Sequence, residues 1–293
     1  MSATYQSSIL AAPLACGRSL SFDIRFEREP KAALTRLRDV LDPQSAVVGL
    51  GDPLVRALGC EIPGLRVFPA IASAEYALPS AQHALWIYLR GADRSAIFDP
   101  SQAVTAALDE AFELVDSIDT FTYADGRDLS GYLDGTANPE GDSAVVVAIA
   151  GRSAPAPGSS FVVVQRWVHD LGRFQAHSQD QRDAIIGRRL SDNEEIADAP
   201  ESSHVKRTAQ ETFSPMAFMV RRSQPWAVNG KSGLEFIAYG ASLDPFERML
   251  RHMAGEDDGT RDALFAFSRP VNGGYYWCPP VSEGKLDWTA VGV

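Results

Sequence analysis

Cysteine and histidine are both scarce in this chain of 293 residues, which contains three cysteines and five histidines. Cys16, Cys60 and Cys278 lie far apart, and no Cys-x-x-Cys or Cys-x-x-Cys-His sequence occurs. This spacing excludes a zinc ribbon and a covalently attached c-type haem. A small, odd number of cysteines is typical of a reducing compartment, so we expect a cytoplasmic protein.

Basic clusters and long apolar runs are also lacking. The formal net charge is −11, and no segment gathers lysine and arginine, so nucleic acid and anionic membranes are not expected partners. No run of about 18 apolar residues occurs that could span a membrane. The segment 1–13 has neither a basic start nor a long apolar stretch, so we expect no signal peptide.

The hydrophobic pattern of the first half predicts a ferredoxin-like unit. The predicted elements follow the order strand, helix, strand, strand, helix, strand. They are a strand over 19–26, a helix that begins at Pro30, strands over 46–50 and 83–90, a helix over 100–115 and a strand over 118–123. The segment 51–82 has no clear pattern.

The second half predicts a loosely similar order of elements, without visible sequence repetition. We expect strands over 143–150, 160–167, 216–221, 234–239 and 275–278, and helices that begin after Ser178 and at Asp244. Because a single core seldom grows beyond about 250–300 residues, two packed units are expected. We therefore predict an α+β fold of two ferredoxin-like domains, 1–130 and 131–293.

Residues 131–139, Gly-Tyr-Leu-Asp-Gly-Thr-Ala-Asn-Pro, place Asp134 between turn-forming residues at the predicted domain boundary. Turn chemistry alone explains Asp-Gly and Asn-Pro equally well. However, Gly-x-x-Asp-Gly followed by Thr-x-Asn-Pro resembles the signature of the dye-decolorizing peroxidases. The resemblance implies a haem b enzyme with haem in the C-terminal domain. It places Asp134 beside the peroxide and Gly135 and Thr136 at the cofactor.

The five histidines are the candidates for an axial haem ligand. His83 begins an apolar strand, and His177 and His252 are explained by their positions at or within helices. His169 is a rival ligand, although its neighbour Asp170 could simply be a helix N-cap. His204 lies in a polar segment without a packing pattern, so the residues alone leave the choice open.

The family resemblance favours His204. This histidine follows Asp134 by 70 positions (204 − 134), which is where the family has its axial histidine. Arg207 matches the basic residue that the family has three positions later, and we expect it at the cofactor.

The apolar run 216–220 ends at two arginines, Arg221 and Arg222. Neighbours on a strand point to opposite faces, so one of the two is expected to be a surface residue. The family has its distal arginine at this position, which assigns Arg221 to the site and Ser223 to a place often held by Asn or Ser. The sequence Gln-Pro-Trp at 224–226 departs from the family's usual Met-Pro-Phe. The resemblance therefore does not predict which residues form the wall of the distal pocket.

Two further residues are implied by the resemblance. Asp262, within Asp-Ala-Leu-Phe-Ala-Phe-Ser, stands where the family has a carboxylate behind the axial histidine. A solvated acid on a helix face is the alternative. Phe236 is expected to pack against haem, although core packing would explain it equally well.

The resemblance extends from about His83 to Pro280, and the short tail beyond Pro280 is most similar to the compact bacterial class B. It implies a cytoplasmic, homo-oligomeric haem b peroxidase that reduces hydrogen peroxide and oxidises small organic donors such as dyes and phenolics. Two other functions stay open at this point. They are a haem carrier with incidental peroxidase activity and a non-haem oligomerisation module. The chain end at Val293 argues against a docking tail for packaging in a protein shell.

Overall fold

The computed structural model of the chain describes residues 4–72 and 77–293. The regular elements of the first half are β1 (Cys16–Ile24), α1 (Pro30–Val40), β2 (Ala46–Leu50), α2 (Asp52–Ala57), β3 (Ile71–Ala72), β4 (Ala77–Leu78), β5 (Leu85–Gly91), α3 (Arg94–Leu108) and β6 (Phe112–Phe121). The 3-10 turn η1 (Ser7–Ile9) precedes them.

The second half begins with α4 (Gly141–Ala148), β7 (Ser160–His169), α5 (Leu171–Gln175), α6 (Gln179–Ile186) and α7 (His204–Arg207). It continues with β8 (Val220–Arg221), β9 (Gln224–Val228), β10 (Lys231–Gly240), α8 (Asp244–Met253), β11 (Ser268–Pro270) and β12 (Gly274–Cys278). The strands β13 (Val281–Ser282) and β14 (Lys285–Leu286) form a separate pair. The 3-10 turns are η2 (Gln210–Thr212), η3 (Ala263–Ala266) and η4 (Thr289–Val291).

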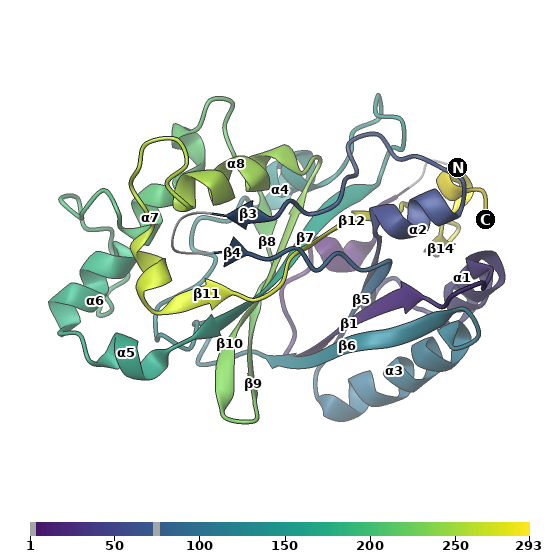
Figure 1. The fold of residues 1–293 in the computed structure, drawn as a ribbon, viewed down its shortest axis with the longest axis horizontal. Helices are drawn as coiled ribbons and strands as arrows, with labels where there is room; N and C mark the ends of the chain where they lie inside the picture. The colour runs from purple at the N-terminus through teal and green to yellow at the C-terminus, as the bar shows by residue number, and fades with distance from the viewer. Residues whose placement is uncertain (1–3, 73–76) are drawn as a thin grey trace.

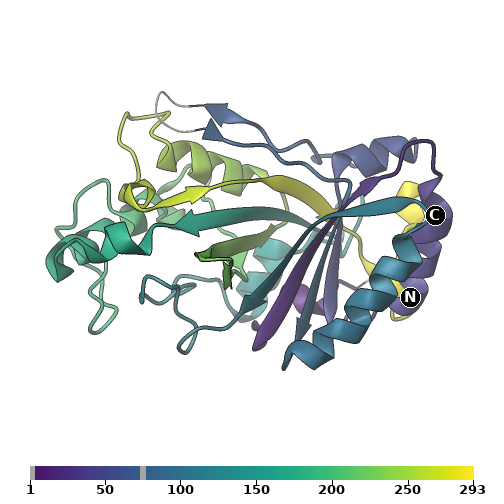
Figure 2. The same cartoon turned by 60° about the horizontal axis from the view of Figure 1, so that its bottom comes forward.

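One ten-stranded sheet runs through both halves of the chain (Figure 1). Its order is β6-β1-β5-β2-β12-β7-β10-β8, with β11 beside β7 and β9 beside β10. The pairings are antiparallel, and β12 joins β2 where Trp277 faces Leu50. The α+β class is therefore confirmed, while the division at residue 130 stays a prediction. Figure 2 shows how the sheet twists between the strands of the first half and those of the second.

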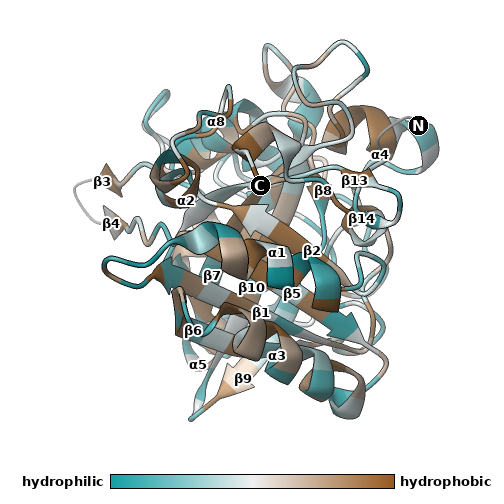
Figure 3. Cartoon of the chain, turned by 90° about the vertical axis from the view of Figure 1, so that its right-hand side faces the viewer, coloured by the Kyte–Doolittle hydropathy of each residue, from teal (hydrophilic) through white to brown (hydrophobic). Residues whose placement is uncertain are grey.

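The two faces of the sheet bury different sets of side chains. Val162 and Val164 of β7 belong to one apolar cluster, and Val163 and Trp167 belong to the other, as strand alternation requires. α1 and α3 cover the strands of the first half (Figure 3). The helices α5, α6, α7 and α8 lie together beside the strands of the second half (Figure 1).

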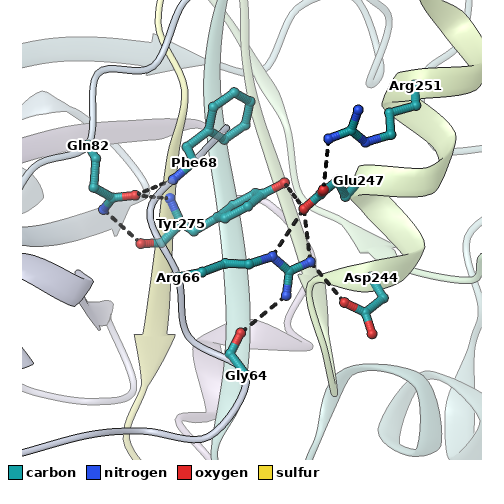
Figure 4. A network of polar contacts seen from close by, with 8 residues as sticks. All are labelled: Gly64, Arg66, Phe68, Gln82, Asp244, Glu247, Arg251 and Tyr275. Atoms are coloured by element: carbon teal, nitrogen blue, oxygen red, sulfur yellow. Dashed lines mark hydrogen bonds and ion pairs between the residues drawn. The ribbon is translucent and has the colours of Figure 1, made fainter. Parts of the chain in front are cut away.

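A network of polar contacts joins the long connection before β3 to helix α8 (Figure 4). Arg66 Nη2 lies 2.8 Å from Asp244 Oδ1 and 2.9 Å from Glu247 Oε2. The Gln82 side chain accepts from the backbone N–H of Tyr275 and donates to its carbonyl oxygen. The contacts of Arg66 bind α8 to this connection, and those of Gln82 bind β12 to the segment before β5.

Two predicted elements of the first half are wrong in their limits. The helix expected over 100–115 lies at Arg94–Leu108 and contains Pro100, because Asp93 caps its start by accepting from the Ala96 N–H. The strand expected over 118–123 begins at Phe112, since Phe112 pairs with Ile24 of β1. Residues from Phe112 onward, which the sequence pattern assigned to the helix, therefore pair with β1 as a strand.

Two predicted strands of the second half are also wrong. Residues 143–150 were expected to form a strand, but α4 occupies Gly141–Ala148. Helical spacing buries Ala144 and Ala148 together and leaves Val146 77% exposed. The strand expected over 216–221 shrinks to Val220–Arg221, because the N–H groups of Ala217 and Met219 bond to Gln210 instead of a strand.

Within the described residues, no helix combines the length and apolar character needed to cross a membrane.

Candidate active site

Two cavities meet beside Asp134 and Arg221. The inner cavity has a volume of about 220 Å³ and lies between the sheet and helices α7 and α8. The outer cavity has a volume of about 290 Å³ and is lined by residues of 122–127 and 221–225. Asp134, Gly135, Arg221 and Leu234 line both cavities, and Asp134 and Arg221 are the charged residues among these four.

Asp134 lies in the loop between β6 and α4. Its N–H donates to the Gly126 carbonyl at 3.3 Å, and Gly135 follows with a φ of 76°, which suits glycine. The side chain is accessible to solvent because it faces the two cavities, yet the protein around the cavities desolvates its carboxyl. This desolvation raises the pKa of the Asp134 carboxyl, and the charge of Arg221 opposes that rise without cancelling it.

Arg221 is the last residue of β8, directly opposite Ala238 of β10. Its buried Nε atom has no hydrogen-bond partner among the described residues. Arg222 lines only the outer cavity, and its guanidinium donates to the carbonyl oxygens of Leu10 and Ala11. The second arginine, expected to be a surface residue, is thus bound to the N-terminal loop. The side chain of Arg221, by contrast, lines both cavities.

His204 begins the short helix α7, so the segment is helical and not irregular as expected. Its Nδ1 lies 2.7 Å from Oδ2 of Asp262, whose side chain is fully buried. Burial acts to lower the pKa of His204, but the carboxylate of Asp262 outweighs it, and the net pKa is raised. With Nδ1 engaged, Nε2 is the ring nitrogen that can reach a metal in the inner cavity.

Asp262 is not a solvated acid on a helix face. It caps η3, where its Oδ1 accepts from the Leu264 N–H at 2.8 Å, while Oδ2 faces His204. Both carboxylate oxygens are thus used, and the orientation of the His204 ring is set by a rigid, buried group.

The rival ligand His169 uses both of its ring nitrogens within the protein. Nδ1 lies 2.7 Å from Ser268 Oγ, and Nε2 lies 3.0 Å from Asp128 Oδ1. The neighbouring Asp170 caps α5 by accepting from the Arg173 N–H, which is the alternative role considered for it. His169 lines the inner cavity but has no nitrogen free for a metal.

The remaining predicted residues are divided between the two cavities and the protein interior. Phe236 and Thr136 line the inner cavity, Gly135 lines both, and Ser223 lines only the outer one. Arg207 is outside both linings, because its guanidinium donates to Asp258 at 2.6 and 3.0 Å. The structure therefore does not bring Arg207 to the site and instead uses it to tie α7 to the loop after α8.

Three amide side chains near the site were not predicted. Gln165 is 1% exposed, lines the inner cavity, and has no partner for either amide atom among the described residues. Asn138 and Gln210 bond the backbone around Arg221. A polar residue inside the apolar strand sequence Phe-Val-Val-Val-Gln was the available signal for Gln165.

The residues of the inner cavity fit a haem by their chemistry. One wall is apolar, with Phe236, Phe246, Met249 and Met253, and the imidazole of His204 lines the cavity from helix α7. The buried Nε of Arg221, Nε1 of Trp167 and the amide of Gln165 have no protein partner among the described residues, so the cavity suits an occupant with both apolar and polar parts.

Comparisons with known proteins identify the family of this chain. Residues 125–283 match the family model described as Dyp-type peroxidase, C-terminal. A dye-decolorizing peroxidase of Brevibacterium linens is 31% identical over 256 residues, which cover 84% of this chain and 69% of the relative. The relative from Mycobacterium tuberculosis is 29% identical over 253 residues, covering 83% and 76% of the two chains.

Solved structures show the same fold. The dye-decolorizing protein from V. cholerae is 27% identical, with a TM-score of 0.85, and the match covers 93% of this chain and 96% of that one. DyPB from Rhodococcus jostii RHA1 is 26% identical, with a TM-score of 0.84 over 93% and 95%. The encapsulated DyP-type peroxidase from Mycobacterium smegmatis is 25% identical, with a TM-score of 0.86 over 95% and 96%. With the family model covering more than half of its length, the chain belongs to the Dyp-type peroxidase family.

Proposed function

We propose that Asp134, Arg221 and His204 carry the haem peroxidase reaction of this chain. Membership of a family of haem-dependent peroxidases makes the chain a peroxide-reducing oxidoreductase. The observation that best supports the assignment of residues is their placement around one cavity. Asp134 and Arg221 line it from the loop and sheet side, and His204 lines it from helix α7.

His204 would hold the iron of haem b through Nε2, and Phe236, Met249 and Met253 would pack on the apolar part of the macrocycle. Bound haem would supply an iron at which peroxide is reduced, and it would hold the two oxidising equivalents taken from peroxide until organic donors reduce it. Asp262 accepts a hydrogen bond from His204 Nδ1, which fixes the tautomer and makes Nε2 a stronger electron donor.

Asp134 would act as the acid–base group. An ionised carboxylate in the cavity can take a proton from the peroxide oxygen nearest to it and return that proton to the departing oxygen. Acid–base help of this kind is worth about 10²–10⁴ in rate. The group must be ionised to begin, and burial makes ionisation of Asp134 less easy than for an ordinary aspartate.

Arg221 would stabilise the negative charge that develops on the departing oxygen. Its side chain lines the same two cavities as Asp134, and its buried Nε is still available as a donor. A fixed donor aimed at developing charge is worth about 3–4 kcal/mol in a dry site. Asp134 would thus transfer the proton and Arg221 would stabilise the charge, and both residues line the same two cavities.

The proposal is tested with the double variant Asp134→Asn, Arg221→Leu. We expect the purified variant to bind haem with a normal Soret band and to lose most of its second-order rate with hydrogen peroxide. A near-wild-type rate in a fully haem-loaded double variant would overturn the assignment. The haem-carrier function is not favoured, because a carrier has no use for a carboxylate and an arginine at the open side of the cavity.

Three features of the biology are part of the proposal. The donors are small organic molecules such as dyes and phenolics, the protein is a homo-oligomer, and it acts in the cytoplasm. One similar structure is described as an encapsulated DyP-type peroxidase. Light scattering of the purified holoenzyme tests the oligomer, and a single monomeric mass at working concentration would contradict it.

A further inference from the structure

The side-chain amide of Asn138 bonds both backbone polar groups of Arg221. Asn138 Nδ2 donates to the Arg221 carbonyl at 3.0 Å, and the Arg221 N–H donates to Asn138 Oδ1 at 2.9 Å. β8 is the last strand on the path of the sheet, and the next residue, Arg222, bonds inward to Ile237 of β10. The polar groups of Arg221 therefore point outward, and the amide of Asn138 takes the place of a neighbouring strand.

The same asparagine is bound to the turn that carries Asp134. The Asn138 N–H donates to the Gly135 carbonyl at 3.0 Å and closes the turn. A Cβ atom at Gly135 would lie only 3.0 Å from Asn138 Nδ2, and Gly135 has a φ of 76°. Glycine is therefore required on two grounds, and the turn is packed directly on the amide that holds Arg221.

We infer that Asn138 is a positioning residue that fixes Arg221 against Asp134 where the two cavities meet. The inference rests on the proposed roles of Asp134 and Arg221. One planar amide joins the turn of the carboxylate to the strand of the cation. The Arg221 carbonyl also accepts from Arg222 Nη1 at 2.9 Å, whereas the Arg221 N–H bonds Asn138, so the amide is the bond that ties Arg221 to the turn of Asp134. A displacement of about 1 Å in such a pair can cost about 10²-fold in rate.

A second amide side chain also joins this loop to the segment before β8, so the bonds of Asn138 can be removed while the loop stays attached. Gln210 is 2% exposed, its Nε2 donates to the Ala137 carbonyl at 2.9 Å, and its Oε1 accepts from the Met219 N–H at 2.9 Å. Gln210 thus joins the loop to the segment that leads into β8. Ala137 directly precedes Asn138, and Met219 lies two residues before Arg221. Removal of the Asn138 amide should loosen Arg221 while the surrounding chain keeps its path.

The experiment uses the haem-loaded variant Asn138→Ala and stopped-flow rates with hydrogen peroxide. We expect the second-order rate constant to fall by about 10–100-fold, with haem content and the Soret band unchanged. Asn138→Asp keeps the shape and the acceptor for the Arg221 N–H but loses the donor to its carbonyl, and it should also be slower than wild type. It serves as the test if Asn138→Ala does not fold.

A pH profile separates positioning from a general structural defect. Asp134 is influenced by Arg221 on β8, by Asp128 in its own loop and by His204 on α7. Because Arg221 holds the pKa of Asp134 down, loosening Arg221 should move the pH at which the rate falls to a higher value. A rate lowered equally at every pH, with no shift of the midpoint, would overturn the inference.

A control and a double variant complete the test. Asn272→Ala also removes an amide that accepts from a strand N–H, that of Arg166, and should react at nearly the wild-type rate. Adding Asn138→Ala to Arg221→Leu should cause little further loss, because Asn138 acts through Arg221. If Arg221→Leu is slow and Asn138→Ala reacts near the wild-type rate, the positioning role of Asn138 is wrong and the proposed function still holds. If Arg221→Leu and Asp134→Asn are both near wild type, the proposed function fails.

Discussion

His204 Nδ1 lies 2.7 Å from Oδ2 of Asp262, and this contact joins the candidate metal ligand to a fully buried carboxylate. Asp262 cannot turn away, because its other oxygen accepts from the Leu264 N–H. The ring of His204 is therefore held with Nε2 free, whereas His169 in the same cavity has both nitrogens engaged. This difference between the two histidines leads to the first two predictions.

His204→Ala is expected to lose haem. Among the described residues that line the inner cavity, no other histidine has a ring nitrogen free, so the purified variant should show little or no Soret absorbance. His169→Ala is the matched control and should retain the band, since His169 bonds Ser268 and Asp128 and not a metal. The opposite result, with haem kept in His204→Ala and lost in His169→Ala, would exchange the two roles.

Asp262→Asn is expected to weaken the axial ligand without removing it. The amide has the shape of the carboxylate but carries no charge, so His204 should donate less electron density to iron. We expect a higher reduction potential of the bound haem and release to excess apomyoglobin about 10–100-fold faster, in the range found for partners of metal ligands. An unchanged potential would mean that Asp262 acts only as the cap of η3.

The reaction with peroxide should depend on the ionisation of Asp134. Burial raises the pKa of this carboxyl, so the second-order rate should begin to fall at a higher pH than an ordinary aspartate would give. The fall occurs as pH decreases, because the protonated acid cannot accept the peroxide proton. Asp134→Asn should remove this step from the stopped-flow pH profile, and the same profile in the variant would mean that another group titrates.

Arg221→Leu is expected to slow the peroxide reaction more than Asp134→Ala. A missing cation costs about 10²–10³ in rate, and a missing base costs a similar amount. Water can replace a base more easily than a cation, and the outer cavity reaches Asp134. Both variants should bind haem, so their second-order rate constants can be compared directly. A larger loss in Asp134→Ala would indicate that the carboxylate dominates and that the cavity is dry.

Local sequence was sufficient to predict an element whose two ends are fixed by residues next to them in the chain. The helix expected after Ser178 is α6. A capping box between Ser178 and Gln181 begins it, and Gly187 ends it in the left-handed region at a φ of 92°. The resemblance also named Asp134, Arg221 and His204, and these three residues line one cavity. Their roles remain proposals that the variants test.

Local sequence was insufficient where two patterns compete. The valines of 145–147 have high strand propensity, yet α4 forms because it buries Ala144 and Ala148 together. The helical pattern of 100–115 extended into residues that instead pair with β1. In both places the deciding interaction comes from another part of the chain.

The sequence by itself determined the family and the residue types of the site, because the motif residues stand at their family spacing along the chain. Only the tertiary structure decided how those residues are held. Asn138 reaches Arg221 across 83 positions, and His204 reaches Asp262 across 58. The tertiary structure also turned Arg207 toward Asp258 and away from the cavity. Such bonds depend on backbone groups and side chains that meet only after the sheet has formed, so no local pattern encodes them.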